Sequence, residues 1–139
     1  MKSLAAVLVE LGKPLVLEEI EIPKLAYGQV LVKVQCSGIC GSQIGEINGA
    51  KGTDKYLPHL LGHEGTGLVL ECGEGVNSVN KDDKVVLHWR KGDGIQSPSP
   101  TYHSKNLGTV NAGWVTTFNQ YAVVSENRIT TIPEDFDSE

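Results

Sequence analysis

The chain has 139 residues, a formal net charge of −5 at pH 7 and a sequence pI near 5.3. This length fits one domain that can bury enough surface to fold without disulfide bonds. The acidic balance argues against a general nucleic-acid binder and against a protein that binds anionic membranes. The longest apolar run near the N-terminus, Leu4 to Val9, is too short for a signal peptide or for a membrane span of about 20 residues.

The cysteines are few and odd in number, which is typical of reduced thiols rather than of a disulfide framework. They are Cys36, Cys40 and Cys72. We therefore expect a cytoplasmic protein, with neither a membrane nor a nucleic acid among its partners.

Short strands dominate the expected secondary structure. Apolar runs and period-2 alternation predict strands over residues 4–9, 15–22, 30–35, 68–70, 84–89, 118–124 and 128–132. A short helix is predicted over Ser42 to Asn48, ending at Gly49. Strands of this length, separated by Gly and Pro, are typical of a β-barrel or a β-sandwich.

Two segments interrupt this rhythm. Residues 90–113 are rich in Gly, Ser, Pro and Asn and predict a long surface loop, a feature that is usually functional or mobile. Pro133, followed by acidic residues, predicts the first turn of a helix. Because the chain stops where that helix would begin, we expect it to be part of a larger protein.

Two pairs of residues have the types found in small zinc sites: Cys36-x3-Cys40 and His59-x3-His63. The long gap between the pairs, and the helix-breaking residues around the histidines, argue against a four-ligand structural site. We favour instead a buried thiol at a strand end for Cys36, and a surface or capping histidine for His59.

A glycine-rich segment carries a histidine and a glutamate side by side. Taken alone, it is either a tight bend with a solvated glutamate or a bend that presents a metal-ligand type beside a carboxylate. Its longer pattern is Gly62-His63-Glu64-x2-Gly67-x5-Gly73-x2-Val76. This pattern resembles the zinc-containing alcohol dehydrogenase signature of the medium-chain dehydrogenase/reductase family.

Three further segments resemble the same family, and the likeness runs from about residue 3 to residue 136. They are 38–42, 79–85 and 113–121. The resemblance implies that residues 1–139 form the N-terminal GroES-like catalytic domain, a mainly β fold with a partly open β-barrel and a few short helices. No Gly-x-Gly-x-x-Gly occurs, so we expect the nucleotide-binding Rossmann domain to lie outside this chain.

The resemblance also implies roles for individual residues. Cys40 and His63 would be zinc ligands, and Glu64 a carboxylate that can approach the metal during ligand exchange. Ser42 would take the proton of the alcohol, although it could instead cap the short helix. Trp89 would line the substrate pocket, although a core or rim tryptophan is an equal alternative. A catalytic zinc keeps three protein ligands, and the third is expected outside this chain.

The sequence departs from the family pattern in several places. Gln43 stands where relatives often have an aspartate that orients the zinc-binding histidine, and we expect its amide oxygen to accept that hydrogen bond instead. Gly45 replaces a histidine of the proton relay. Residues 90–113 contain no cysteine, so we expect one catalytic zinc and no structural zinc.

The expected function is that of the zinc- and substrate-binding domain of an NAD- or NADP-linked alcohol or polyol dehydrogenase. Its substrates would be small alcohols, aldehydes or ketones, and the full-length protein would be a homo-oligomer. The chain alone is expected to be inactive. Two alternatives remain: a non-enzymatic GroES-like binding or assembly module, and a zinc-free relative of the quinone reductase type.

Overall fold

The computed structural model describes residues 1–137, and in this range the elements follow one another closely. The strands are β1 (Lys2–Leu8), β2 (Val16–Glu21), β3 (Gln29–Ser37), β4 (His59–Leu60), β5 (Glu64–Cys72), β6 (Lys84–His88), β7 (Thr101–Ser104), β8 (Gly108–Asn111), β9 (Tyr121–Ser125) and β10 (Ile129–Thr131). The helices are α1 (Gly41–Ile47) and a 3-10 turn, η1 (Glu126–Arg128).

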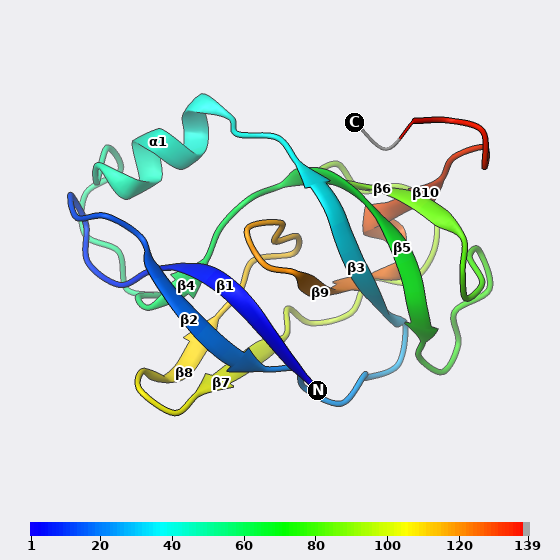
Figure 1. The fold of residues 1–139 in the computed structure, drawn as a ribbon, viewed down its shortest axis with the longest axis horizontal. Helices are drawn as coiled ribbons and strands as arrows, with labels where there is room; N and C mark the ends of the chain where they lie inside the picture. The colour runs from blue at the N-terminus through cyan, green and yellow to red at the C-terminus, as the bar shows by residue number, and fades with distance from the viewer. Residues whose placement is uncertain (138–139) are drawn as a thin grey trace.

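The strands form a closed ring and an adjoining sheet (Figure 1). The ring has the order β1-β2-β7-β8-β4, and the five-stranded sheet has the order β10-β6-β5-β3-β9. A bridge between Ala5 of β1 and Asn119, shortly before β9, links the two parts. This mainly β architecture with a partly closed barrel and short helices confirms the predicted fold class.

Strand β3 lies between β5 and β9, and its first half is buried on both faces. Val30 and Val32 belong to the hydrophobic cluster on one side of the sheet, and Leu31 to the cluster on the other side. The same alternation puts Val123 and Val124 of β9 into different clusters. These two strands therefore share the wall between the two halves of the core.

Irregular pairing at the end of β3 leads the chain toward α1. The register between β3 and β5 shifts between Val34 and Cys36, which marks a bulge. Figure 1 shows the chain leaving β3 and running to α1, which lies outside both sheets at one end of the barrel. The segment between α1 and β4 then returns to the ring.

The prediction of a long loop over residues 90–113 is wrong in part, because β7 and β8 form a hairpin there. Tyr102 and Val110 face each other in this hairpin and are buried. The hairpin is also held by Glu18 of β2, whose carboxylate accepts a hydrogen bond of 2.6 Å from the Ser104 hydroxyl. Residues 101–111 contain few apolar side chains, so the alternation of apolar and polar residues that would predict these two strands is weak in the sequence.

Other boundaries differ from the predicted ones by a few residues. The strand predicted from Phe118 begins at Tyr121, and the two-residue β4 was not predicted. In place of a helix start, Pro133 accepts a turn hydrogen bond of 3.0 Å from the Phe136 backbone N–H. Residues 138–139 lie outside the described range. Among residues 1–137, no helix has the length and hydropathy of a membrane span.

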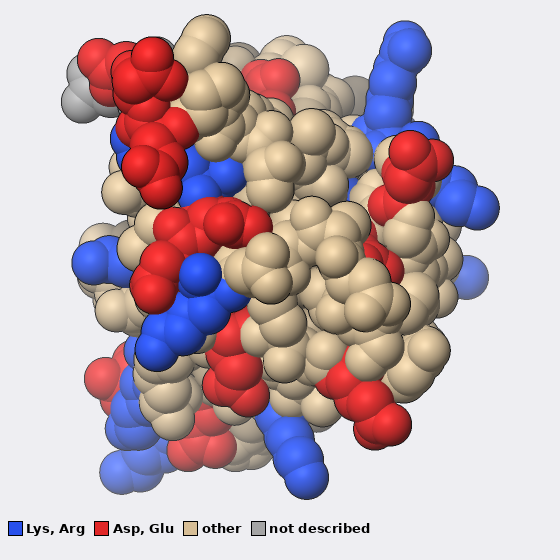
Figure 2. All heavy atoms as spheres, turned by 90° about the vertical axis from the view of Figure 1, so that its right-hand side faces the viewer, with Lys and Arg blue, Asp and Glu red and all other residues tan. Residues whose placement is uncertain are grey.

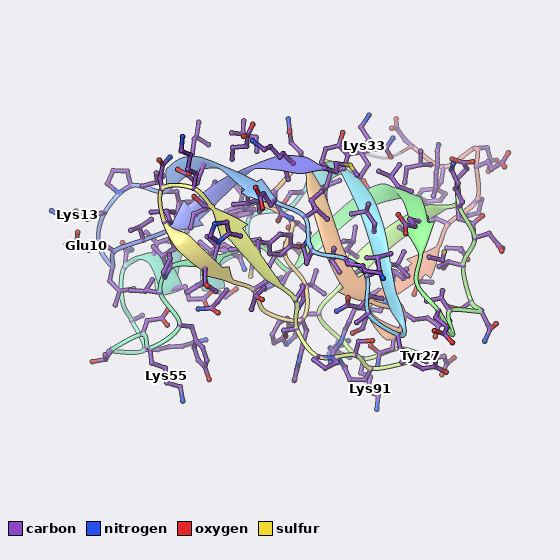
Figure 3. The ribbon with its side chains drawn as sticks, turned by 90° about the horizontal axis from the view of Figure 1, so that it is seen from below. Glu10, Lys13, Tyr27, Lys33, Lys55 and Lys91 are labelled. Carbon is purple, nitrogen blue, oxygen red and sulfur yellow. The ribbon has the colours of Figure 1, made fainter. Side chains whose placement is uncertain are left out.

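The charged side chains are spread over the surface in the views shown. Figure 2 shows acidic and basic residues interspersed among uncharged ones on one face. In Figure 3, Glu10 and Lys13 project from the turn between β1 and β2, and Lys55 projects at the same end of the molecule. Tyr27 and Lys91 lie toward the other end.

Candidate metal centre

Cys40 is the N-cap residue of α1 and has extended backbone angles, φ −97° and ψ 153°. Hydrogen bonds from the side chain and then the backbone of Ser42 hold the pKa of the Cys40 thiol below its ordinary value of 9.0, although the charge of Glu64 acts in the opposite direction. A lowered thiol pKa favours the thiolate, which is the metal-binding form of cysteine.

His63 lies in the segment that leads into β5 and is linked to the Cys40 backbone through the Gln43 side chain. The preceding Gly62 has φ +92°, and a side chain there would clash with Thr117. Glycine is therefore needed for the bend that presents His63. Nδ1 of His63 lies 2.9 Å from the side-chain nitrogen of Gln43, while Nε2 has no hydrogen-bond partner among residues 1–137.

Gln43 connects the helix cap to the histidine. Its side chain is 2% exposed, and its amide oxygen accepts a hydrogen bond of 2.8 Å from the Cys40 backbone N–H. As the third residue of α1 it makes the returning half of a capping box. The expectation that this amide oxygen faces His63 is therefore wrong: the amide NH2 group faces the ring.

Glu64 begins β5 and packs against the loop before Cys40. A side chain at Gly38 would lie 2.7 Å from Oε1 of Glu64, so glycine makes room for this carboxylate. The backbone N–H of Gly38 donates to the Glu64 carbonyl at 3.0 Å, which fixes the two segments side by side. The structure thus brings Glu64 close enough to affect the charge of the Cys40 thiol.

Ser42 and Trp89 border a cavity beside these residues. The cavity has a volume of about 280 Å³, and Ser42, His63 and Trp89 all line it. Ser42 is the second residue of α1, so it is not the cap, and its hydroxyl lies 3.2 Å from the Gln43 side-chain nitrogen. Trp89 is 49% exposed, which places it at the rim rather than in the core.

An aromatic row that was not predicted from the sequence continues from His63. The His63 and Trp89 rings are 6.3 Å apart, and the Trp89 and Trp114 rings are 5.3 Å apart. The guanidinium of Arg128 lies 4.4 Å from the Trp114 ring and donates to the Trp89 carbonyl. A tryptophan beside Gly113 in a polar loop was the available signal, since a large exposed aromatic often marks a binding surface.

Both tryptophans also line a second cavity of about 470 Å³, with His59 and Asp54 in its wall. His59 is 7% exposed, so the surface position expected for it is wrong. Its Nε2 lies 2.8 Å from the Asp54 carboxylate, and its Nδ1 lies 2.9 Å from the Leu60 carbonyl oxygen. These contacts give His59 a structural role in β4, and none of them involves His63.

The donor types around Cys40 suit zinc. A thiol with a lowered pKa, an imidazole with one nitrogen free of partners and a carboxylate in a glycine cradle are the ligand types that zinc takes. Across residues 1–137, however, no three Cys, His, Asp or Glu side chains converge closely enough to enclose a metal ion. Cys40, His63 and Glu64 therefore do not form a complete metal site within the described residues.

Comparison with known proteins shows the family of the chain. The family model for the alcohol dehydrogenase GroES-like domain matches residues 26–134. The chain belongs to this family. An alcohol dehydrogenase of Moraxella sp. is 33% identical over 96% of the chain, and a class-3 alcohol dehydrogenase of Cereibacter sphaeroides is 41% identical over 81% of it.

Solved structures share the fold of this GroES-like domain. The benzyl alcohol dehydrogenase of Acinetobacter calcoaceticus superposes over 99% of the chain with a TM-score of 0.80 and 23% identity. An alcohol dehydrogenase zinc-binding domain protein of Burkholderia ambifaria superposes over 97% with a TM-score of 0.83 and 22% identity. The chain spans 41% of the Moraxella relative and 43% of each of these two structures.

Proposed function

We propose that this GroES-like domain supplies two ligands of a catalytic zinc and one wall of the alcohol-binding cavity of a zinc-dependent alcohol dehydrogenase. The observation that carries the proposal is that Ser42 and His63 line one cavity beside Trp89, while the Gln43 side chain joins His63 to the backbone of Cys40. The family membership and the alcohol dehydrogenases among its relatives support it.

Bound zinc would act as a Lewis acid that lowers the pKa of an alcohol hydroxyl. Cys40, at the start of α1, and His63, just before β5, would hold the ion. Glu64 would remain close by as a carboxylate of the metal surroundings. The third ligand and the NAD- or NADP-binding Rossmann domain would come from outside these 139 residues.

The side chains of this domain would position the alcohol and move its proton. The Ser42 hydroxyl is exposed at the cavity and would accept the proton released as the alcohol ionises. Trp89 and Trp114 would cover the alcohol and keep water from it, since the cavities beside them are partly apolar. Gly45 provides no side chain to carry the proton further, so solvent would receive it.

Metal binding by purified variants tests this proposal. We expect Cys40→Ser and His63→Ala each to weaken Zn²⁺ binding at least about tenfold in competition with a fluorescent chelator, because each removes one of two ligands. With Co²⁺, the thiolate-to-metal absorption band should appear in the wild type and vanish in Cys40→Ser. Cys72→Ser and His103→Ala are matched controls outside the site and should leave binding unchanged.

Equal zinc affinity in wild type and Cys40→Ser, with the cobalt band retained, would show that the metal binds elsewhere. Chelator-resistant zinc that depends on Cys36 and His59 would instead support the four-ligand site. Ring assembly in solution without metal binding would support the alternative of a binding or assembly module.

A further inference from the structure

We propose that Gln43 is a positioning residue that holds the proton of neutral His63 on Nε2, and that this arrangement weakens zinc binding by the histidine. The first half concerns the metal-free chain alone. The second half rests on the proposed function, because it assigns His63 to the metal.

The hydrogen bonds of the Gln43 amide determine which His63 nitrogen carries the proton. The amide oxygen is 2.8 Å from the Cys40 backbone nitrogen, and the amide nitrogen is 2.9 Å from Nδ1 of His63. An amide NH2 group can only donate, so Nδ1 must accept. A neutral imidazole has a single N–H, which therefore sits on Nε2.

The surroundings of Gln43 disfavour the orientation in which the oxygen and nitrogen of its side-chain amide exchange places. Turning Gln43 over would place its NH2 group against the Cys40 backbone N–H, so that two donors would face each other and a partly buried donor would lose its partner. At 2% exposure, the Gln43 side chain has almost no access to water that could compensate. The amide oxygen of Gln43 therefore accepts from the backbone at the start of α1, and the amide nitrogen is the atom that faces His63.

This orientation conflicts with metal binding. Zinc needs a nitrogen lone pair, and Nε2 is the His63 nitrogen without a partner among the described residues. To offer that lone pair, His63 must move its proton to Nδ1, where it meets the NH2 group of Gln43. A carboxylate of the same length would accept from both the Cys40 N–H and the Nδ1–H. Gln43→Glu should therefore raise zinc affinity, by about 10- to 100-fold for a partner of this kind.

The tautomer can be measured without any metal. Two-bond ¹H–¹⁵N correlation spectra of the metal-free chain at about pH 8.5, where imidazoles are neutral, should show His63 protonated on Nε2 in the wild type. In Gln43→Glu the proton should move to Nδ1. A wild-type spectrum with the proton on Nδ1 would overturn the proposal, and this measurement needs no variant to fold.

Zinc competition titrations test the consequence. Ile44→Glu is the matched control, because it adds the same charge at an exposed neighbouring position of α1. We expect a large gain in affinity for Gln43→Glu and less than about a threefold change for Ile44→Glu. Equal gains in both variants would show that charge alone acts, and would overturn the positioning role.

The two proposals fail in distinguishable ways. If the cobalt absorption test shows no metal binding through Cys40 in any variant, the proposed function is wrong. The proposed effect of Gln43 on zinc affinity is then wrong as well. The Nε2 assignment would still be decided by the metal-free spectra, which depend only on the contacts of Gln43.

Discussion

Glu126 is a buried carboxylate that joins segments far apart in the chain. Its Oε1 accepts hydrogen bonds from the backbone N–H groups of Asn77 and Ser78 at 2.7 and 2.8 Å, and its Oε2 accepts one from Ile95 at 2.9 Å. Burial raises the pKa of the Glu126 carboxyl, but these three donors outweigh burial, and the pKa lies below its ordinary 4.5. The charged form therefore stabilises the fold.

Replacing this carboxylate should destabilise the domain. We expect Glu126→Gln to lose about 1–3 kcal/mol of unfolding free energy in urea denaturation, because a buried donor loses its acceptor. Since the folded pKa is depressed, the contribution is present above pH 4.5 and is lost as the pH falls below that value. The variant should thus show a flatter acid dependence than the wild type. Glu74→Gln, at an exposed position, is the control and should change neither quantity.

Tyr102 should give the opposite pH dependence. Burial raises the pKa of the Tyr102 phenol to about 12, although the Val123 backbone N–H, which donates to its oxygen at 2.8 Å, acts against this rise. The folded pKa of Tyr102 exceeds its unfolded value of 10.0. The contribution of the neutral phenol to the free energy of unfolding is therefore fully present below pH 10 and declines as the pH rises toward 12. Urea unfolding across this range should show the decline in wild type and in the control Tyr27→Phe. An unchanged decline in Tyr102→Phe would refute the assignment.

At the scale of elements, a glycine allows β3 and β5 to approach closely, whereas a glycine in α1 is not required by its surroundings. A side chain at Gly67 would lie 2.5 Å from the Lys33 carbonyl oxygen on the paired strand. At Gly45, in the middle of α1, the nearest atom would be 3.7 Å away, which is ordinary contact. The same substitution should therefore have opposite effects in the two elements.

We expect Gly67→Ala to destabilise the domain by about 1–3 kcal/mol, because the backbone of β3 would have to move. Gly45→Ala should instead stabilise it by about 0.5–1 kcal/mol, since alanine is the better helix former. Thermal unfolding followed by circular dichroism measures both. A neutral Gly67→Ala would mean that the two strands can separate without loss of the core.

At the scale of the whole molecule, residues 1–137 contain no dinucleotide-binding turn. Its only α-helix in residues 1–137 is α1, which follows β3 through the Cys40 loop and not through a glycine-rich phosphate-binding turn. The aromatic row from His63 to Trp114 lies beside two cavities at the surface. We therefore expect the cofactor to be held outside this chain.

The chain alone should neither bind NADH or NADPH at micromolar concentrations nor oxidise alcohols. Hydride transfer needs the nicotinamide and the alcohol about 3–3.5 Å apart, and the described residues contain no glycine-rich phosphate-binding turn that would hold the dinucleotide there. Titrations of each cofactor, followed by fluorescence and by heat, measure the binding. Alcohol-dependent NADH formation above that of Cys40→Ser would place a cofactor site within these residues.

The fold class, the family and the candidate ligands could all be predicted from the amino-acid sequence. Period-2 alternation in residues 30–35 and the fixed spacing from Gly62 to Val76 depend on neighbours along the chain, and such local patterns can be read directly. For the same reason the absence of cysteines in residues 90–113 was visible, as was the substitution at Gln43. The roles of Cys40, His63, Ser42, Glu64 and Trp89 remain predictions from the family pattern.

Only the tertiary structure decided which groups face one another. The hairpin of β7 and β8 depends on two buried side chains and on Glu18, which is remote in sequence. The burial of His59 depends on its strand pairing and on Asp54. The orientation of the Gln43 amide depends on two partners at once, a helix cap and a histidine 20 residues away. Hydrogen bonds of this kind have a direction that a sequence pattern does not record, because it gives the residue and not the atom that each neighbour meets.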